Sequence, residues 1–434
     1  MTAAPARIPA PLDILDPALA GRIAALAPRL EGYANLLVRR CVAVAQGQEL
    51  VVTAPVEAAY FARMVVRAGY DAGAGHVTVI WGDDDVARLE YERTPLAYFE
   101  RMPAWKRAQL NDLAEQGACF LWLEGEDPDV LAGIDPRKPA AARKARNTEA
   151  TAWRDGMDFG RNRWGIAGVP TAAWARKVFP DEGTVSAIAR LWDAILATAR
   201  ADNDDPLEAW RAHDEAFARS LAFMNGHHFD RLHYVSANGT DLTVGLTDRH
   251  VWAGGSGAST DGVRFFPNIP TEEVFTSPDR MRVSGIVHAA LPLVHDGVVI
   301  RDFWFRFSDG AVVAHGAATG GEVLDHILAT DENARRLGEC ALVSKNTPIR
   351  QSGLLFYSTL YDENASCHLA LGTGFPECYE GGLAMGADEL LAHGVNHSAT
   401  HVDFMIGADD LRVDGVAADG TVTPVFVDGQ WAWE

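Results

Sequence analysis

The sequence is poor in cysteine and contains no long apolar run. Its 434 residues include only five cysteines, which are widely spaced and form no CxxC pair: Cys41, Cys119, Cys340, Cys367 and Cys378. An odd number of scattered cysteines disfavours a disulfide framework and a cysteine-based zinc site. No stretch approaches the roughly 18 uninterrupted apolar residues that a membrane span needs, and the N-terminal segment lacks the apolar core of a signal peptide. We therefore expect a soluble, cytoplasmic protein.

Basic residues are also few relative to acidic residues. The chain has 38 lysines and arginines against 59 acidic residues, which gives a formal net charge of −21. Such a field repels phosphate backbones and anionic lipids, so we expect no nucleic acid and no membrane surface among the partners. A hydrophobic share of 48% is enough to fill sizeable cores, and the length suggests two or three domains.

Several catalytic motifs are missing. There is no GxSxG, no P-loop and no HExxH. The glycines of Gly73–Gly75 precede a predicted strand instead of following one, which disfavours a dinucleotide site. The glycine-rich segment Gly254–Ser259 is not followed by the GK[ST] of a phosphate loop. Cys367 or Cys378 could pair with a histidine as a nucleophile, but a histidine near a cysteine in sequence is common by chance.

The first half of the chain alternates strand and helix patterns. Gln48–Ala54 and His76–Trp81 read as strands, and Val56–Ala68 between them has the spacing of a helix that Gly69 can stop. Cys119–Leu123 is a third strand candidate. A strand, helix and strand within about 35 residues predict a βαβ unit and hence a parallel sheet. We expect an N-terminal α/β domain over residues 1–228.

The second half of the chain has a different sequence pattern. Short alternating runs are separated by Asn-Gly and Asp-Gly pairs, as at Asn238-Gly239 and Asp309-Gly310, which are typical of hairpin turns. Phe303, Phe305 and Phe307 alternate with Trp304 and Arg306, as in a half-buried strand. We expect an α+β C-terminal catalytic domain with a largely antiparallel sheet over residues 229–434, after predicted helices near 185–199 and 207–224.

Histidines and carboxylates in this second half suggest metal chemistry. His401 and Asp403 would point to the same face of a strand and could hold one ion together. His368 lies in an apolar run, Glu273 at the start of an element, and Glu339 just before the apolar run Cys340–Val343. Taken singly, these can be a core histidine, a capping carboxylate and a paired buried charge. Together they form a mixed oxygen and nitrogen set that suits two ions of zinc, cobalt or manganese.

Four blocks carry a resemblance to a known family. PTEEVFTSPDR, LGECALV, LLFYSTLYDENASCHLALG and THVDFMIG stand in this order and resemble the signature blocks of the M29 metallo-aminopeptidases. ANGTDLTVGL at 237–246 and QGQELVVTAP in the first half fit as well. The resemblance is dense from about 230 to 416 and weaker before that.

The resemblance implies a ligand set and an activity. The family holds two divalent ions with two glutamates, two histidines and an aspartate, which fall here on Glu273, Glu339, His368, His401 and Asp403. It also implies a homodimer with a deep cavity that admits short peptides, from which a two-metal-activated water removes N-terminal residues. Glu339 is the candidate for the bridging ligand and for the proton relay. Glu272, next to a ligand, is the alternative base.

One position departs from the family pattern. The family reads LGxxYP after the histidine block, and its tyrosine is thought to assist at the reacting carbonyl, whereas this sequence has Phe375 before Pro376. Tyr379 could supply the missing hydroxyl, a metal alone could polarise the carbonyl, the tyrosine could be dispensable, or the substrate could be a small non-peptide amide. A metal-dependent dioxygenase of related fold, which would need iron, and an inactive binding protein are the remaining alternatives.

Overall fold

The computed structural model describes residues 16–295 and 298–434 of the chain. Contacts divide these residues into two compact units: one comprises the residues up to Arg211 together with Ser256–Pro270, and the other Ala212–Gly255 together with Thr271–Glu434. As folding domains, 1–228 and 229–434 stay a prediction. None of the described helices is long and apolar enough to cross a membrane.

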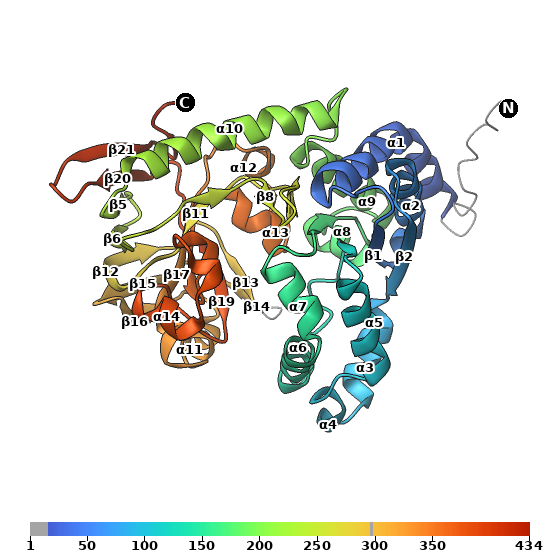
Figure 1. Cartoon of the computed structure of the whole chain (residues 1–434), viewed down its shortest axis with the longest axis horizontal. Coiled ribbons are helices and arrows are strands. Elements are labelled where there is room, and N and C mark those ends of the chain that lie inside the picture. Colours follow the sequence, from blue (N-terminus) through green and yellow to red (C-terminus); the bar gives the residue numbers. More distant parts are fainter. Residues whose placement is uncertain (1–15, 296–297) are drawn as a thin grey trace. The chain divides into compact units, whose positions relative to one another are not determined.

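The first unit is built on a parallel sheet (Figure 1). Its strand order is β10-β4-β3-β1-β2, and all neighbouring strands are parallel. The strands are β1 (Glu49–Pro55), β2 (His76–Gly82), β3 (Cys119–Glu124), β4 (Trp164–Gly168) and β10 (Asn268–Ile269). The longer helices are α1 (Pro17–Leu36), α2 (Ala59–Ala72), α3 (Asp84–Arg93), α5 (Ala104–Glu115), α6 (Arg137–Glu149), α7 (Thr151–Asp158), α8 (Ala172–Val178) and α9 (Thr184–Thr198).

Helix α2 connects β1 to β2 in a βαβ unit, and our prediction of the residue at which this helix ends is wrong. We expected Gly69 to stop this helix, but the helix continues to Ala72 and ends at Gly73, whose φ of 102° suits a glycine cap. Gly69 instead allows close packing on the sheet, because a Cβ there would lie 2.9 Å from Leu50 Cδ2 and 3.2 Å from Val77 Cγ2. The glycine therefore serves packing between elements.

The second unit contains two mainly antiparallel sheets. The larger has the order β16-β15-β12-β6-β5-β20-β21-β22, and the other the order β19-β18-β17-β11-β7. The strands of the larger sheet are β5 (Arg231–Val235), β6 (Asp241–Leu246), β12 (Pro278–His288), β15 (Trp304–Ser308), β16 (Ala311–Gly316), β20 (Arg412–Val416), β21 (Val422–Val427) and β22 (Gln430–Trp431). Those of the other are β7 (Ala253–Gly254), β11 (Val274–Thr276), β17 (Leu337–Leu342), β18 (His368–Gly372) and β19 (His401–Met405).

A shared apolar core joins the two sheets of the second unit. It contains Leu232, Val244 and Phe305 from the larger sheet and Cys340 and Leu369 from the other. Phe217 and Met224, on the helix α10 (Pro206–His227), pack on the same core. The second unit also contains the helices α11 (Gly321–Leu328) and α14 (Ala387–Ala392). The predicted fold class, a parallel α/β part followed by a largely antiparallel α+β part, is confirmed.

Candidate metal centre

Four adjacent strands bring the predicted ligands together. Glu339 lies on β17, His368 opens β18, and His401 and Asp403 lie on β19. Glu273 immediately precedes β11, which pairs with β17. Glu273 and Asp403, which are 130 positions apart in the chain, thus meet at one sheet, because its strands are ordered β19-β18-β17-β11. The predicted ligand residues from all four blocks are neighbours in space.

The strand register places these side chains on one face of the sheet. Ala370 of β18 pairs with Glu339 on one side and with Asp403 on the other. Paired residues share a face and side chains alternate along a strand, so His368 and His401 point to the same side as well. The alternate residues, such as Cys340 and Leu369, enter the apolar core on the other face.

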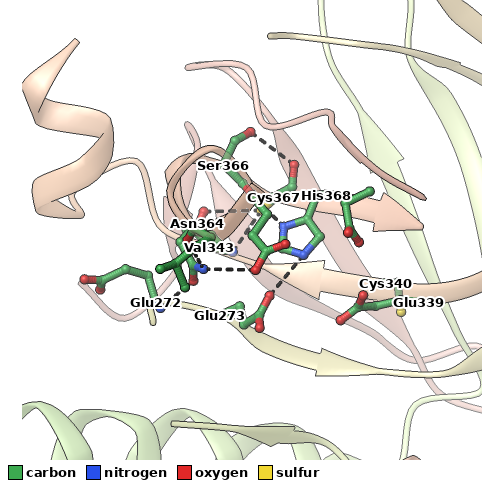
Figure 2. A network of polar contacts seen from close by, with 12 residues as sticks. Glu272, Glu273, Glu339, Cys340, Val343, Asn364, Ser366, Cys367 and His368 are labelled. Atoms are coloured by element: carbon green, nitrogen blue, oxygen red, sulfur yellow. Dashed lines mark hydrogen bonds and ion pairs between the residues drawn. The ribbon is translucent and has the colours of Figure 1, made fainter. Parts of the chain in front are cut away.

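Two ligand groups share one glutamate. Donor atoms of Glu273, Glu339 and His368 lie within 4.8 Å of one another, and those of Glu339, His401 and Asp403 do the same. His368 Nε2 is 3.0 Å from Glu273 Oε2, and His401 Nε2 is 3.1 Å from Asp403 Oδ1 and 3.3 Å from Glu339 Oε2. Figure 2 shows Glu273 directed toward the ring of His368. Glu339 is the member that belongs to both groups.

Backbone carbonyls orient both imidazole rings. Nδ1 of His368 is 3.1 Å from the carbonyl oxygen of Ser366, and Nδ1 of His401 is 2.8 Å from that of Thr373. A carbonyl oxygen can only accept, so Nδ1 carries the hydrogen and donates it. In the neutral ring Nε2 then presents a lone pair toward the carboxylates, an arrangement that a divalent cation between them would satisfy. The chemistry of this donor set therefore fits zinc, cobalt or manganese.

Burial and charge strongly perturb these groups. Burial, opposed by the hydrogen bond with His401, raises the pKa of Glu339 to about 7. Burial acts to lower the pKa of His368, but the hydrogen bond and charge of Glu273 hold that pKa well above its usual range. Three carboxylates with two imidazoles concentrate negative charge in a site where Glu339 and His368 are 4% and 1% exposed. Such a site favours divalent cations.

Comparison with known proteins agrees with this geometry. The profile of the family described as thermophilic metalloprotease (M29) matches residues 26–431. The chain belongs to the M29 metallopeptidase family. Aminopeptidase 2 of Geobacillus stearothermophilus is 44% identical over 405 residues, covering 93% of this chain and 98% of its own length. Aminopeptidase T of Thermus aquaticus is 40% identical over 94% of this chain and 99% of its own length.

A solved structure gives the same result at the level of the fold. Wild-type AmpT from Thermus thermophilus superposes with a TM-score of 0.88 at 39% identity, over 94% of this chain and 100% of the other. The predicted family, fold class and enzyme class, a metallopeptidase, are therefore confirmed. The names of the relatives favour an aminopeptidase over a small-amide hydrolase.

The structure of this M29 protein separates Glu272 from the ligand groups. Its Oε2 lies 3.6 Å from Nε2 of His213, and its backbone N–H donates to Asn364. Figure 2 shows its carboxylate directed away from the ring of His368. Glu272 belongs to neither group of candidate ligands. Its carboxylate therefore does not take part in the arrangement that would hold the ions.

Phe375 and Tyr379 occupy different surroundings. The ring of Phe375 lies 5.1 Å from that of His401 and 5.4 Å from that of Phe275, measured between centroids. The hydroxyl group of Tyr379 instead contacts Asp248 and the Nδ1 atom of His393, at 3.2 and 3.0 Å. Phe375 therefore adjoins the candidate metal centre, and Tyr379 has its hydroxyl group engaged elsewhere.

Glu363 is a residue of this site that the sequence analysis missed. It lines a small cavity with Asp403, next to Tyr357, Thr359 and Met405. Burial, together with the charges of Asp403 and Glu273, raises its pKa well above the usual value. Its place in the DENASCHLALG block, five residues before His368, was the available signal, but nothing in that pattern distinguishes a carboxylate at the site from one in a surface turn.

The cysteines do not offer a nucleophile. All five are free and buried. Burial raises the pKa of Cys119 and that of Cys367 to about 12, so both remain neutral thiols near pH 7. The alternative of paired cysteine and histidine catalysis is not favoured by this arrangement.

Proposed function

We propose that this chain is a metallo-aminopeptidase that removes N-terminal residues from short peptides with the help of two divalent metal ions. The proposal rests on the position of Glu339, whose carboxylate belongs to two groups of candidate ligands at once. Glu273 and His368 would complete one ion's site, and His401 and Asp403 the other. Zinc, cobalt or manganese would suit these ligands.

The protein's own residues orient and hold the reacting groups. When bound, the ions would supply an activated water and polarise the scissile carbonyl group. The carbonyls of Ser366 and Thr373 fix the rings of His368 and His401, so that each Nε2 faces the site. Glu339 is our first candidate to pass the proton of the water to the leaving amine, and Glu272 is the second.

Acidic side chains also account for selection of the peptide's end. A free α-amine is positively charged near neutral pH, and a site rich in buried carboxylates binds it favourably. Glu363, which shares a cavity with Asp403, adds a carboxyl group at this place. An acetylated N-terminus carries no such charge, so it would lose this interaction.

Hydrolysis of paired peptides tests the proposal. We expect metal-loaded protein to release the first residue of a tripeptide and of an aminoacyl anilide, and to leave the N-acetylated forms of both intact. Protein stripped of metal and refilled with zinc, cobalt or manganese would show which ion supports the reaction. Cleavage of the acetylated peptide at an equal rate, or no cleavage of any free peptide with any of these metals, would contradict the proposal.

We also propose that the enzyme acts as a homodimer in the cytoplasm. The family resemblance supports the homodimer, and the composition of the chain supports the location. Sedimentation of the purified protein at several concentrations measures the first, and fractionation of the cells that make it measures the second. A sedimenting species with the mass of one chain at all concentrations, or recovery outside the cytoplasm, would overturn the respective statement.

A further inference from the structure

One of the five candidate metal ligands lies outside the strands. Glu273 stands just before β11, in a segment without regular secondary structure, whereas the other four ligands belong to β17, β18 and β19. Strand pairing fixes the backbone of those four ligands, but the backbone of residues 271–273 needs other partners. The position of Glu273 therefore depends on side chains that bind this segment.

The side chain of Asn364 binds this segment. Its Oδ1 accepts a hydrogen bond from the backbone N–H of Glu272, at 2.7 Å, directly before the ligand Glu273. Its Nδ2 donates to the carbonyl oxygen of Leu360, at 3.0 Å, and to Oε1 of Glu363, at 3.4 Å. A backbone N–H can only donate and a carbonyl oxygen can only accept, so these partners require this orientation of the amide. Figure 2 shows Asn364 and Glu272 together, to the left of the His368 ring.

Asn364 also belongs to the segment that carries the partner of Glu273. It lies in the 3₁₀ turn Glu363–Ala365, and β18 begins at His368, three residues after this turn. One amide thus connects the backbone beside Glu273 to the chain that leads into His368. The two ligands are 3.0 Å apart, from Oε2 of Glu273 to Nε2 of His368. The length of one asparagine side chain therefore sets how closely their segments approach.

Burial makes these hydrogen bonds important for position. Asn364 has an exposed fraction of 0%, and Glu273 and His368 are 9% and 1% exposed. Water does not replace a lost partner in such surroundings, and a buried N–H without a partner is costly. The native state therefore keeps the backbone of Glu272 against Asn364.

We propose that Asn364 is a positioning residue, which holds Glu273 beside His368. By doing so it sets the affinity for the ion that this pair would bind together with Glu339. The inference rests on the proposed two-metal function. The ligands of the other ion all lie on strands, so they keep their backbone positions when the amide is lost. Asn364 therefore acts on one ion of the two.

Titration of the metal-stripped protein with cobalt tests the proposal. Competition with a chelator gives an affinity for each ion, and the visible absorption of bound cobalt depends on the number and geometry of its ligands. We expect the parent protein to bind two ions. Asn364→Ala should bind one of them with unchanged affinity and the other at least about 10-fold more weakly, as when a group that orients a metal ligand is removed.

Ligand variants identify the ion that is weakened. His368→Ala removes a ligand of one group, so the ion that it retains gives the spectrum of the other group. The ion that Asn364→Ala retains should give this same spectrum, and the ion that His401→Ala retains should give a different one. Asn364→Leu has a similar branched shape but forms no hydrogen bond, so it should behave like Asn364→Ala.

Asn162 provides a matched control. It is a buried asparagine of the first unit, 2% exposed, whose amide donates to the carbonyl oxygens of Ala114 and Ala118 at 3.0 and 2.8 Å. Asn162→Ala loses buried hydrogen bonds of the same kind, so it should lower the unfolding temperature. Both cobalt affinities should stay as in the parent protein.

The contrary results are distinct. Equal weakening of both ions in Asn364→Ala, or failure of both Asn364 variants to fold, would overturn the proposal, because Asn364 would then support the fold as a whole. Unchanged affinities in both variants, or weakening of the ion that His368→Ala retains, would overturn it as well. A parent protein that binds fewer than two ions would contradict the proposed function itself, and the inference would fall with it.

Discussion

At the scale of single residues, Glu339 is the side chain on which the two ligand groups depend. It is 4% exposed, sits on the central strand β17, and faces both His401 and the Glu273–His368 pair. Ala370 lies between Glu339 and Asp403 in the strand register. A side chain as small as alanine leaves space between these carboxylates, where the ions would lie.

Replacing Glu339 by Gln is expected to reduce aminopeptidase activity by at least about 10²-fold, because a charged group that organises the reaction is neutralised. The bound metal per chain should fall as well, since both ions would lose a ligand. Metal content and hydrolysis rates of the same samples measure this.

Glu272→Gln is the matched control, since it makes the same change at the adjacent, non-ligand carboxylate. It should retain the metal. A large loss of activity with full metal content in Glu272→Gln, together with an active Glu339→Gln, would move the proton relay to Glu272.

Phe375 is the second position where one residue decides the chemistry. Its ring lies beside His401, whereas the hydroxyl group of Tyr379 is engaged with Asp248 and His393. Phe375→Tyr adds a hydroxyl group at the candidate site, and we expect it to raise kcat on aminoacyl anilides by at least about 10-fold, since one well-positioned transition-state donor contributes roughly 10²–10³-fold. Steady-state kinetics of the parent, Phe375→Tyr and Phe375→Leu measure this. An unchanged or lower kcat in Phe375→Tyr would show that the hydroxyl has no role here.

At the scale of elements, the strands hold the site through very close backbone contacts. Gly372 ends β18 with a φ of +107°, and a Cβ there would lie only 2.0 Å from the carbonyl oxygen of Thr400, next to His401. An L-residue at this position is strained and would push β19 away.

We therefore expect Gly372→Ala to lower the free energy of unfolding by about 1–3 kcal/mol and to reduce activity strongly. Denaturant unfolding and hydrolysis assays check this. Gly21→Ala is the control: Gly21 is exposed within α1, nothing lies within 4 Å of an added Cβ, and alanine should stabilise the helix by up to about 1 kcal/mol. Equal effects of the two substitutions would contradict the strained contact.

The local elements were largely predictable, and their long-range pairing was not. Strands β1, β2 and β3 and helices α9 and α10 lie close to the predicted ranges, because hydrophobic periodicity is a local signal. The two-residue strand β10, which joins the parallel sheet from Ser256–Pro270, has no such signal. It depends on a contact with β4, about 100 residues earlier in the chain.

The candidate site shows the same division. The five candidate ligands could be chosen from the family blocks, because metal chemistry restricts residue type, and the structure brings these residues together. The carbonyl partners of the two histidine rings, the cavity that Glu363 shares with Asp403 and the place of Ala370 follow only from strand register. That register is set by packing between residues far apart in sequence.

At the scale of the whole molecule, the metal ions should contribute to stability as well as to activity. Ligands that bind the native state alone stabilise it, by about 2.7 kcal/mol per site at a free concentration 100 times the dissociation constant. Metal removal also leaves the carboxylates of Glu273, Glu339 and Asp403, which are buried or half-buried, close together without a divalent cation. We expect a lower unfolding temperature in the metal-free protein, restored by adding the metal, as measured by calorimetry. Identical transitions with and without metal would contradict tight binding at this site.

The most direct test of the central claim is the number of metal ions bound per chain, measured by elemental analysis together with hydrolysis of an aminoacyl anilide during refilling. We predict two divalent ions per chain at full activity, and no activity after complete removal of metal. Full activity with one ion or none per chain would contradict a centre in which Glu339 joins two ligand groups.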